Sequence, residues 1–219
     1  MALTTVHVAP ALSVLLPPVG TRLGVPTRTA HPGVLLTFDD GPHPRGTPAV
    51  LDRLAAAGAS AAFFFVGEQV RRRPTLVAEV AAAGHTIALH GDRHRSPLRL
   101  GPRAMIEDLR RGLDALATAT GAPVAMYRPP YGHLSTSALL AARRCGLAVL
   151  LWSRHGGDWR RGASARSIVA RLQGMRPGDV VLLHDSDSYS RAGSWKHTEQ
   201  AIPRLLEQVA ALNPAVDRS

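Results

Sequence analysis

The sequence predicts an α/β protein in which parallel strands are joined by helices, and three observations support this prediction. Short apolar runs alternate along the chain with longer segments of helical periodicity, as they do in folds built from strand–helix–strand units. Glycines follow the ends of several helical segments, where a left-handed residue commonly ends a helix. Polar residues that could act in catalysis or bind a metal follow the ends of several apolar runs, which is where α/β barrels place their active sites. Together these features favour a barrel.

Six apolar runs have the length expected of buried strands, namely residues 34–38, 61–66, 86–89, 124–127, 148–152 and 180–184. Six segments have helical character, namely residues 47–57, 74–83, 102–120, 135–145, 164–172 and 198–210. Thr47 followed by Pro48 predicts an N-cap and a first-turn proline. The run Arg71-Arg72-Arg73 precedes Pro74, and we expect it to form an exposed turn.

The length of 219 residues is that of one domain. We expect residues 1–32 to form an arm packed on a domain of residues 33–219. Residues 8–19 are apolar, but three prolines interrupt them and no basic residue precedes them, so they make a poor secretory signal. A degenerate signal or a membrane-surface anchor is the alternative. No apolar run approaches the roughly 20 residues of a membrane span.

Cysteine usage also bears on the compartment. Cys145 is the only cysteine, so no disulfide can form within the chain, and the sequence fits a reducing environment. We therefore expect a cytoplasmic location in preference to secretion, with a peripheral membrane location as the alternative. Cys145 falls in a helical segment, where a free thiol most often packs as a small apolar residue.

The chain is strongly basic, with a formal net charge of +10 at pH 7 and only one lysine, Lys196. Such a charge attracts anionic partners, such as a cell-wall polymer, a phosphate-linked sugar, a membrane surface or a nucleic acid. A compositional preference for arginine on solvated helix faces explains it equally well. No recognition helix, RNA-binding signature or zinc-finger spacing accompanies the charge, so we expect no nucleic-acid partner.

Two short stretches together predict a metal site. Asp39 and Asp40 end an apolar run, and Gly41-Pro42 supplies a bend there. Adjacent strand residues point to opposite faces, so both carboxylates serve one site only where the strand ends. His90 and His94 are four residues apart, a spacing that lets both imidazoles reach one ion. Two histidines and one carboxylate leave coordination positions for water and substrate.

A third stretch completes the set of groups that hydrolysis requires. His184 ends the apolar run of residues 180–184, far along the chain from the first two stretches. A metal, a spare carboxylate and a distant histidine are the components of metal-assisted hydrolysis. Zn²⁺ suits nitrogen and oxygen ligands with open positions, and Co²⁺, Mn²⁺, Fe²⁺ and Ni²⁺ are alternatives.

The motifs occur in an order that resembles a known family, the NodB-type polysaccharide deacetylases of carbohydrate esterase family 4. The resemblance covers about residues 33–210 and rests on Thr37-Phe38-Asp39-Asp40-Gly41-Pro42, His90-x-x-x-His94, Arg128-Pro129-Pro130-Tyr131-Gly132, Asp158-Trp159 and Leu182-Leu183-His184-Asp185. It implies a distorted, incomplete (β/α) barrel. It also implies that residues 33–219 are a catalytic domain that removes acetyl groups from N-acetylated amino sugars, whether in a glycan, a lipid-linked saccharide or a small metabolite.

The resemblance leaves alternatives open. A carbohydrate O-acetyl esterase and a catalytically inactive sugar-binding relative would carry similar motifs. Two positions depart from the family pattern: Gly91 stands where the family usually has Ser or Thr, and His155 stands where it often has an acid. The partner that we expect is an acetylated saccharide, for which an anionic or a lipid-linked form is an option. The sequence does not indicate an oligomeric state.

Matching the family motifs residue by residue implies the following roles. Asp40, His90 and His94 would bind one divalent metal, and Asp39 would act as the general base. His184 would act as the general acid.

The resemblance also implies residues that support these groups. Asp158 would pair with His184 and favour its protonated form. Arg128 would orient the base, Asp39. The backbone amide of Tyr131 would stabilise the oxyanion, and Pro129 would set the turn before it at the substrate site.

Further residues are candidates for substrate contact. Trp159 and Leu182 would form apolar walls for the acetyl methyl group, although each could equally be plain core. Trp195, with Tyr189 and Asp187, lies on a polar stretch after His184 that we interpret as a substrate lip. An aromatic side chain there could stack on a sugar ring, and an ordinary solvent-facing loop is the alternative.

Overall fold

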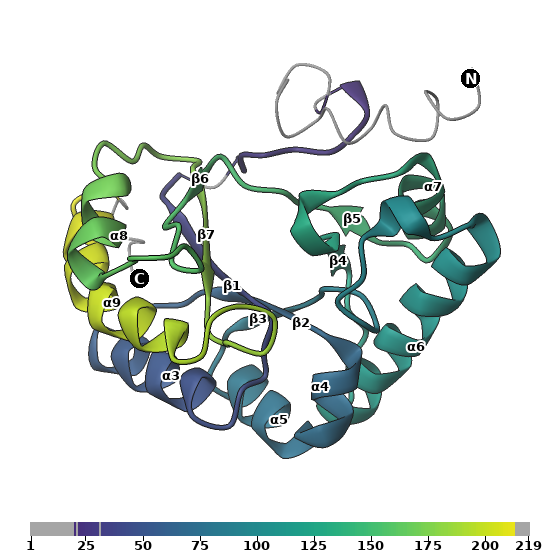
Figure 1. Cartoon of the computed structure of the whole chain (residues 1–219), viewed down its shortest axis with the longest axis horizontal. Helices are drawn as coiled ribbons and strands as arrows, with labels where there is room; N and C mark the ends of the chain where they lie inside the picture. The colour runs from purple at the N-terminus through teal and green to yellow at the C-terminus, as the bar shows by residue number, and fades with distance from the viewer. Residues whose placement is uncertain (1–19, 21, 31, 213–219) are drawn as a thin grey trace, which may run out of the picture.

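Seven parallel strands form one curled sheet in the described part of the chain, in the order β5-β4-β3-β2-β1-β7-β6. The computed structural model describes residues 20, 22–30 and 32–212. The strands are β1 (Leu35–Asp39), β2 (Ala62–Phe65), β3 (Thr86–Leu89), β4 (Met126–Tyr127), β5 (Ala148–Val149), β6 (Arg154–His155) and β7 (Val180–His184). Figure 1 shows them as an open arc with β5 and β6 at its two ends. This architecture confirms the predicted incomplete (β/α) barrel.

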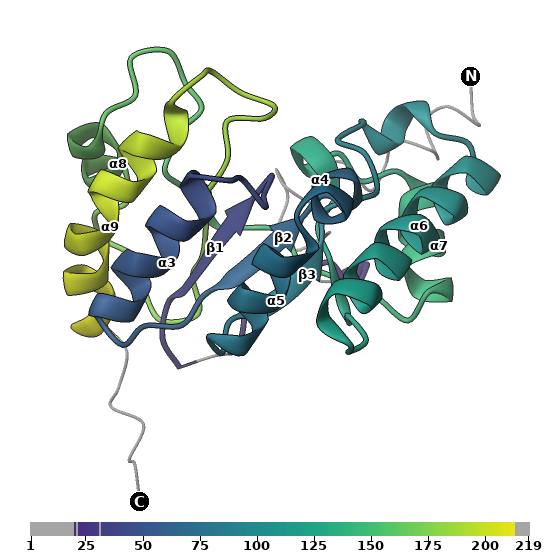
Figure 2. The same ribbon diagram turned by 90° about the horizontal axis from the view of Figure 1, so that it is seen from below.

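Helices surround the outer side of the arc (Figure 1), and Figure 2 shows α3 and α5 lying along the strands β1 to β3. The helices are α3 (Gly46–Ala56), α4 (Gly67–Arg72), α5 (Pro74–Ala82), α6 (Pro102–Thr120), α7 (Thr136–Arg144), α8 (Ala165–Arg171) and α9 (Ser194–Ala210). Within the described residues, two single-turn 3-10 helices, η2 (Pro97–Arg99) and η3 (Pro130–Gly132), interrupt the loops. None of the helices within the described residues is both long and apolar enough to cross a membrane.

The main core lies between the sheet and the outer helices. Phe38 of β1 is paired in register with Phe63 of β2, and their rings stack with centroids 5.2 Å apart. Phe64 points to the opposite, inner face, where it packs with Ala62, Leu150 and Val180. Both faces of the central strands are therefore covered, which explains why these strands are continuous apolar runs.

The structure corrects several details of the sequence prediction. Arg71 and Arg72 close the short helix α4 rather than forming a turn. Thr47 lies inside α3 and does not cap it, because the N-cap position is Arg45. The Thr47 hydroxyl instead accepts a hydrogen bond from the His43 amide at 2.7 Å. The two-residue strand β6 was not predicted, since its Arg154 and His155 carry no apolar signal.

Part of the predicted N-terminal arm lies within the described residues. The Leu151 amide donates to the carbonyl of Pro26 at 3.0 Å, and the Thr29 amide donates to that of Gly178 at 2.9 Å. Val25, which precedes Pro26, is fully buried. The segment of residues 22–30 thus contacts the chain just after β5, at Leu151, and just before β7, at Gly178, and it crosses the open side of the arc (Figure 1). The remainder of the arm, including the apolar residues 8–19, lies outside the described residues.

Candidate active site and metal centre

The carboxyl ends of β1 and β7 carry the central groups of the site. The two strands are neighbours, and their register places Asp39 opposite His184. Asp40 follows in a left-handed conformation, with φ of 78°, so the strand ends there and the chain turns. The bend that brings both carboxylates to one site therefore begins at Asp40 itself, one residue before the predicted Gly41-Pro42 turn.

Asp40, His90 and His94 form a cluster that could hold a metal ion. One ligand atom from each residue lies within 4.8 Å of the other two. Asp40 Oδ1 is 3.5 Å from His90 Nε2 and 3.2 Å from His94 Nε2. All three side chains are almost completely buried, and a cluster of this donor set suits a divalent transition metal.

The tautomer of His90 supports this assignment. Its Nδ1 lies 2.8 Å from the carbonyl oxygen of Arg128, and only an N–H can face a carbonyl at that distance. Burial lowers the pKa of His90 to about 4, although Asp39 and Asp40 oppose this, so the ring is neutral near pH 7. Its Nε2 lone pair therefore faces the Asp40 carboxylate, so two acceptors face each other without a donor between them. A cation bound between the two acceptors would satisfy both.

Asp40 is ionised over the whole physiological range. Burial acts to raise its pKa, but His94, His184 and His90 outweigh burial and lower the pKa to about 2. Its Oδ1 has no hydrogen-bond donor among the described residues. A buried carboxylate oxygen without a donor is costly, and a metal ligand bond would satisfy it.

Asp39 has a different environment. Its Oδ1 accepts a hydrogen bond from Arg128 at 2.7 Å, while its Oδ2 lies 3.8 Å from His90 Nε2. One oxygen is thus fixed by a guanidinium, and the other faces the cluster from a longer distance than Asp40 does. This geometry fits a carboxylate that accepts a proton beside the ion rather than one that binds it.

Arg128 is the largest fully buried side chain, with none of its surface exposed. Besides Asp39, it donates to Thr37 Oγ1 at 2.8 Å and to the carbonyls of Leu150 and Leu151 at 3.0 and 2.9 Å. Its guanidinium carbon lies 3.9 Å from the centroid of the Phe64 ring. The arginine is therefore fixed in one orientation and fixes Asp39 in turn.

His184 is paired with Asp158. Its Nδ1 lies 3.1 Å from Asp158 Oδ1, and its backbone amide donates to Asp158 Oδ2 at 2.7 Å. Thr198 donates to the same carboxylate at 2.8 Å. Burial alone would lower the pKa of His184, but Asp158 outweighs it and raises the pKa to about 10. The ring is an imidazolium at neutral pH, with its Nε2 4.0 Å from Asp40 Oδ2.

We expect Asp158→Asn to lower the titration midpoint of His184 in the metal-free protein. The wild-type ring keeps its proton below a pKa of about 10 and loses it as the pH rises through that value. Without the Asp158 charge, only Asp40 and Asp39 still oppose burial, and removal of an adjacent opposite charge typically shifts a pKa by about 1–3 units. Ring ¹⁵N chemical shifts followed by NMR measure this midpoint. An unchanged midpoint in Asp158→Asn would show that Asp158 does not control the protonation of His184.

A cavity of about 490 Å³ opens over these groups, which is a size typical of ligand sites. The predicted residues Asp39, Asp40, His90, His94, Tyr131, Trp159, Leu182 and His184 line it. Gly132, Trp152, Tyr189, Ser190 and Arg191 also line it. The predicted Pro129 is buried and does not line the cavity, and its carbonyl accepts from the Gly132 amide at 2.9 Å.

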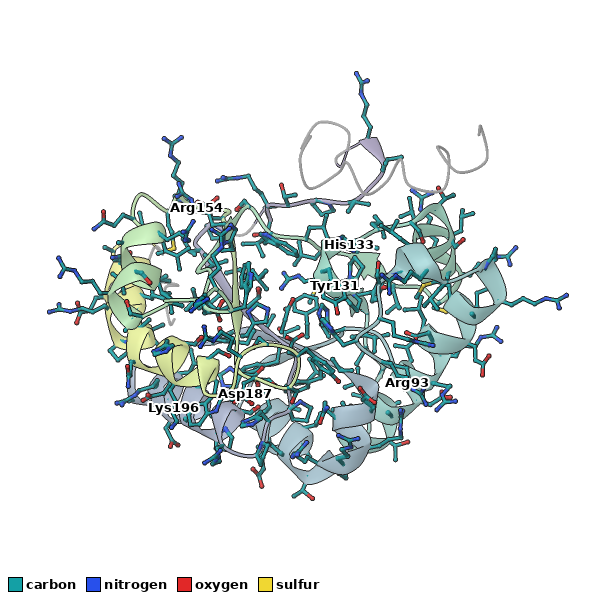
Figure 3. All side chains as sticks on the ribbon, in the orientation of Figure 1. Arg93, Tyr131, His133, Arg154, Asp187 and Lys196 are labelled. Carbon is teal, nitrogen blue, oxygen red and sulfur yellow. The ribbon has the colours of Figure 1, made fainter. Side chains whose placement is uncertain are left out.

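Aromatic rings gather at the mouth of this cavity. Tyr131 is left-handed, with φ of 62°, and is 56% exposed. In Figure 3 it lies inside the arc of strands, close to His133. Tyr189 stacks on His94, with ring centroids 4.4 Å apart and planes inclined by 15°. Its hydroxyl donates to Glu68 at 2.6 Å, so the loop after β7 is tied to α4 directly over a metal-cluster residue.

Trp195 does not line the cavity, and the prediction that it belongs to a loop was wrong. It lies in the first turn of α9 and is 9% exposed. Its ring packs against His43, with centroids 5.8 Å apart, and against the backbone of Gly46. The helix begins four residues earlier than the predicted Thr198, because Gly193 at the N-cap adopts a left-handed conformation.

Two buried carboxylates to which the sequence analysis gave no role support the site. Asp185 contacts Thr47 Oγ1 by a hydrogen bond and fills the space where a Cβ on Gly41 would lie. Gly41 is therefore required beside the metal cluster. Asp108 of α6 accepts from the Asp92 amide at 2.9 Å. A Cβ on Gly91 would lie 3.1 Å from Asp108 Oδ2, so this carboxylate braces the loop where the family usually has a hydroxyl.

Comparisons with known proteins agree with this geometry. The sequence model of the polysaccharide deacetylase family matches residues 27–150. A chitooligosaccharide deacetylase of Sinorhizobium fredii is 38% identical over 158 residues, which cover 72% of this chain and 74% of that protein. A peptidoglycan-N-acetylglucosamine deacetylase of Bacillus cereus is 31% identical over 177 residues, which cover 80% of this chain and 82% of that protein.

A solved structure shows the same fold. The family 4 carbohydrate esterase from Streptomyces lividans, determined in complex with acetate, superposes with a TM-score of 0.74 at 32% identity. The superposition covers 83% of this chain and 90% of that chain. The matched family model, the related sequences and the shared half-barrel lead to one conclusion: the chain belongs to the polysaccharide deacetylases of carbohydrate esterase family 4 and is a carbohydrate deacetylase.

Proposed function

We propose that this enzyme hydrolyses the acetamide group of N-acetylglucosamine residues with one divalent metal ion, preferably Zn²⁺, bound by Asp40, His90 and His94. The observation that carries the proposal is the strand register that sets Asp39 opposite His184. A proton acceptor held by Arg128 and a proton donor held by Asp158 thereby flank the metal cluster from neighbouring strands. Acetamide hydrolysis needs both, because the attacking water loses a proton and the leaving nitrogen gains one.

The ion, when bound, lowers the pKa of water and polarises the acetyl carbonyl. Asp39 takes a proton from the attacking water through its Oδ2, while Arg128 keeps Oδ1 in place. His184 donates a proton from Nε2 to the departing nitrogen, since an amine leaves poorly unless it is protonated. Asp158 holds the opposite ring nitrogen and thereby keeps His184 charged.

The cavity lining supports an acetylated sugar as the substrate. Trp159 and Leu182 supply an apolar wall against which the acetyl methyl packs. The Tyr131 backbone amide is our candidate for an oxyanion donor, since the left-handed turn there borders the cavity. The related proteins named for chitooligosaccharide and for peptidoglycan N-acetylglucosamine point to a polymer or oligomer of this sugar. An O-acetylated glycan is the alternative substrate.

The test combines metal removal with a panel of acetylated saccharides. We expect chelated protein to lose deacetylation of chitooligosaccharides, and Zn²⁺ or Co²⁺ to restore it. Release of acetate from the N-acetylated saccharides in preference to O-acetylated xylan supports the proposal. Full turnover by protein shown to be metal-free would contradict it, and an inactive but sugar-binding protein would identify a non-catalytic relative.

A matched pair of variants tests the ligand set. His94→Ala removes one of three ligands, and we expect it to lose the metal, as measured by elemental analysis after dialysis. His133→Ala is the control, because His133 is an exposed histidine of the same region whose Nδ1 lies 3.0 Å from Ser96 Oγ. Equal metal content in the two variants would remove His94 from the ligand set.

A further inference from the structure

Arg191 lines the same cavity as Asp39, Asp40 and His184, and no role is yet assigned to it. Its side chain is exposed and makes no hydrogen bond or ion pair with any residue that the structure describes. In contrast, Asp39 pairs with Arg128, His184 pairs with Asp158, and Asp40 lies against the histidines of the metal cluster. Arg191 is thus an uncompensated positive charge at a catalytic cavity.

The loop that carries Arg191 is anchored on both sides of it. Before it, Tyr189 donates to Glu68 at 2.6 Å. Asp187, labelled in Figure 3 on this loop, pairs with His43 Nε2 at 3.1 Å and accepts from the Gly193 amide at 2.6 Å. These anchors hold Arg191 beside the cavity.

The acids of this loop and of its anchors already have partners. Asp187 is occupied by His43 and Gly193, and Glu68 is occupied by the Tyr189 hydroxyl. Asp185 is buried and bonded to Thr47. The guanidinium therefore has an unmet capacity to bind an anion that arrives from solution.

We propose that Arg191 binds an anionic substituent, a carboxylate, sulfate or phosphate, carried by the acetylated saccharide close to the acetamide that is hydrolysed. The proposal rests on the proposed function, and it adds a substrate class to it. A guanidinium presents paired N–H donors that match the oxygens of such groups. The net charge of +10 also favours the approach of an anionic saccharide.

The other residues of the cavity lining limit the contribution of Arg191 to substrate preference. The cavity offers aromatic and apolar surface from Trp152, Trp159 and Leu182, which suits a neutral sugar ring with an acetyl group. A neutral substrate therefore still binds and reacts. Arg191 supplies a preference, and because it holds the substrate and the transition state alike, we expect the preference in KM rather than in kcat.

The experiment uses metal-loaded enzyme and pairs of saccharides that differ only in charge. The first pair is an N-acetylglucosaminyl disaccharide bearing a carboxylate on the neighbouring sugar and the methyl ester of the same compound. The second pair is N,N′-diacetylchitobiose with and without a sulfate or phosphate ester. At low salt we expect wild-type kcat/KM to favour the charged member by about tenfold, the lower end for a hydrogen bond to a charged group, because Arg191 is exposed.

Variants test whether Arg191 causes the preference for the charged saccharide. Arg191→Gln should abolish the preference by lowering kcat/KM for the charged member about tenfold more than for the neutral member, whereas Arg191→Lys should keep part of it. Arg103→Gln is the matched control, because Arg103 is an exposed arginine in the first turn of α6 and should leave the preference intact. If Arg191→Gln loses the preference within the first pair, the anion is a carboxylate on the neighbouring sugar. If it loses the preference within the second pair, the anion is a sulfate or phosphate ester on the sugar itself.

Three results would overturn the inference. They are a wild type indifferent to charge in both pairs, a preference that survives in Arg191→Gln, and an equal loss on charged and neutral members. If the metal-loaded enzyme turns over none of the saccharides, the proposed function fails instead. Calorimetric affinities for the same pairs, in wild type and Arg191→Gln, then decide the role of Arg191 separately.

Discussion

Asp39→Asn is expected to reduce kcat by about 10²–10⁴, the range in which a general base contributes, while the metal stays bound. Asparagine keeps the shape of the side chain and an oxygen for the 2.7 Å hydrogen bond from Arg128, but it cannot accept a proton from water. The proposed ligands Asp40, His90 and His94 are unchanged, so metal content should match that of wild type. Steady-state kinetics on a chitooligosaccharide, with elemental analysis of the same sample, measures both quantities.

The comparison with Asp40→Asn separates the two adjacent carboxylates. Asp40 Oδ1 lies within 3.5 Å of both histidines, whereas Asp39 comes within 3.8 Å of His90 only. We therefore expect Asp40→Asn to lose the metal and Asp39→Asn to retain it. Loss of metal from Asp39→Asn would make Asp39 a ligand and reverse the division of labour between the two residues.

The sequence predicted the parts of this molecule whose physical cause is local. The helix α6 begins and ends where predicted, at Pro102 and Thr120, because a first-turn proline and a following glycine mark its ends. Gly121 indeed has a φ of 68°. Apolar runs bounded by glycine, proline and charged residues gave the central strands. The metal cluster was also predictable, because its residues follow strands in recognisable short motifs.

Features that depend on contacts between distant segments could not be predicted. The role of Asp185 depends on its packing against Gly41 and its hydrogen bond with Thr47, and no local sequence pattern predicts these contacts. Arg191 is one of many arginines, and only the anchored loop places it at the cavity. Trp195 was misplaced because the polar residues around it obscured the start of α9, whose buried side packs on α3 through Gly46.

The departure at Gly91 shows how the structure compensates for a missing side chain. The left-handed φ of 83° at this residue strains any residue other than glycine. The carboxylate of Asp108 occupies the space nearby and bonds to the next amide in the chain. A long-range contact from α6 thus braces the loop that carries His90 and His94.

Arg128→Ala is expected to destabilise the fold by about 3–5 kcal/mol, the usual cost of removing one partner from a buried ion pair. The change leaves Asp39 buried without its guanidinium. It also leaves the carbonyls of Leu150 and Leu151 without the donors that they now have at 3.0 and 2.9 Å. Urea unfolding followed by circular dichroism measures the free energy of unfolding.

An exposed arginine provides the control for this measurement. Arg53 on α3 pairs with Glu199 on α9 at 2.6 Å, but its side chain is 48% exposed. Surface pairs of this kind contribute about 0–1 kcal/mol, so Arg53→Ala should change stability little. If Arg128→Ala and Arg53→Ala lose similar free energy of unfolding, the buried bonds of Arg128 to Asp39 and the two carbonyls contribute no more than a surface pair. A large loss confined to Arg128→Ala would show that the proposed base, Asp39, is held by a group that also links the ends of β1 and β4 to the segment after β5.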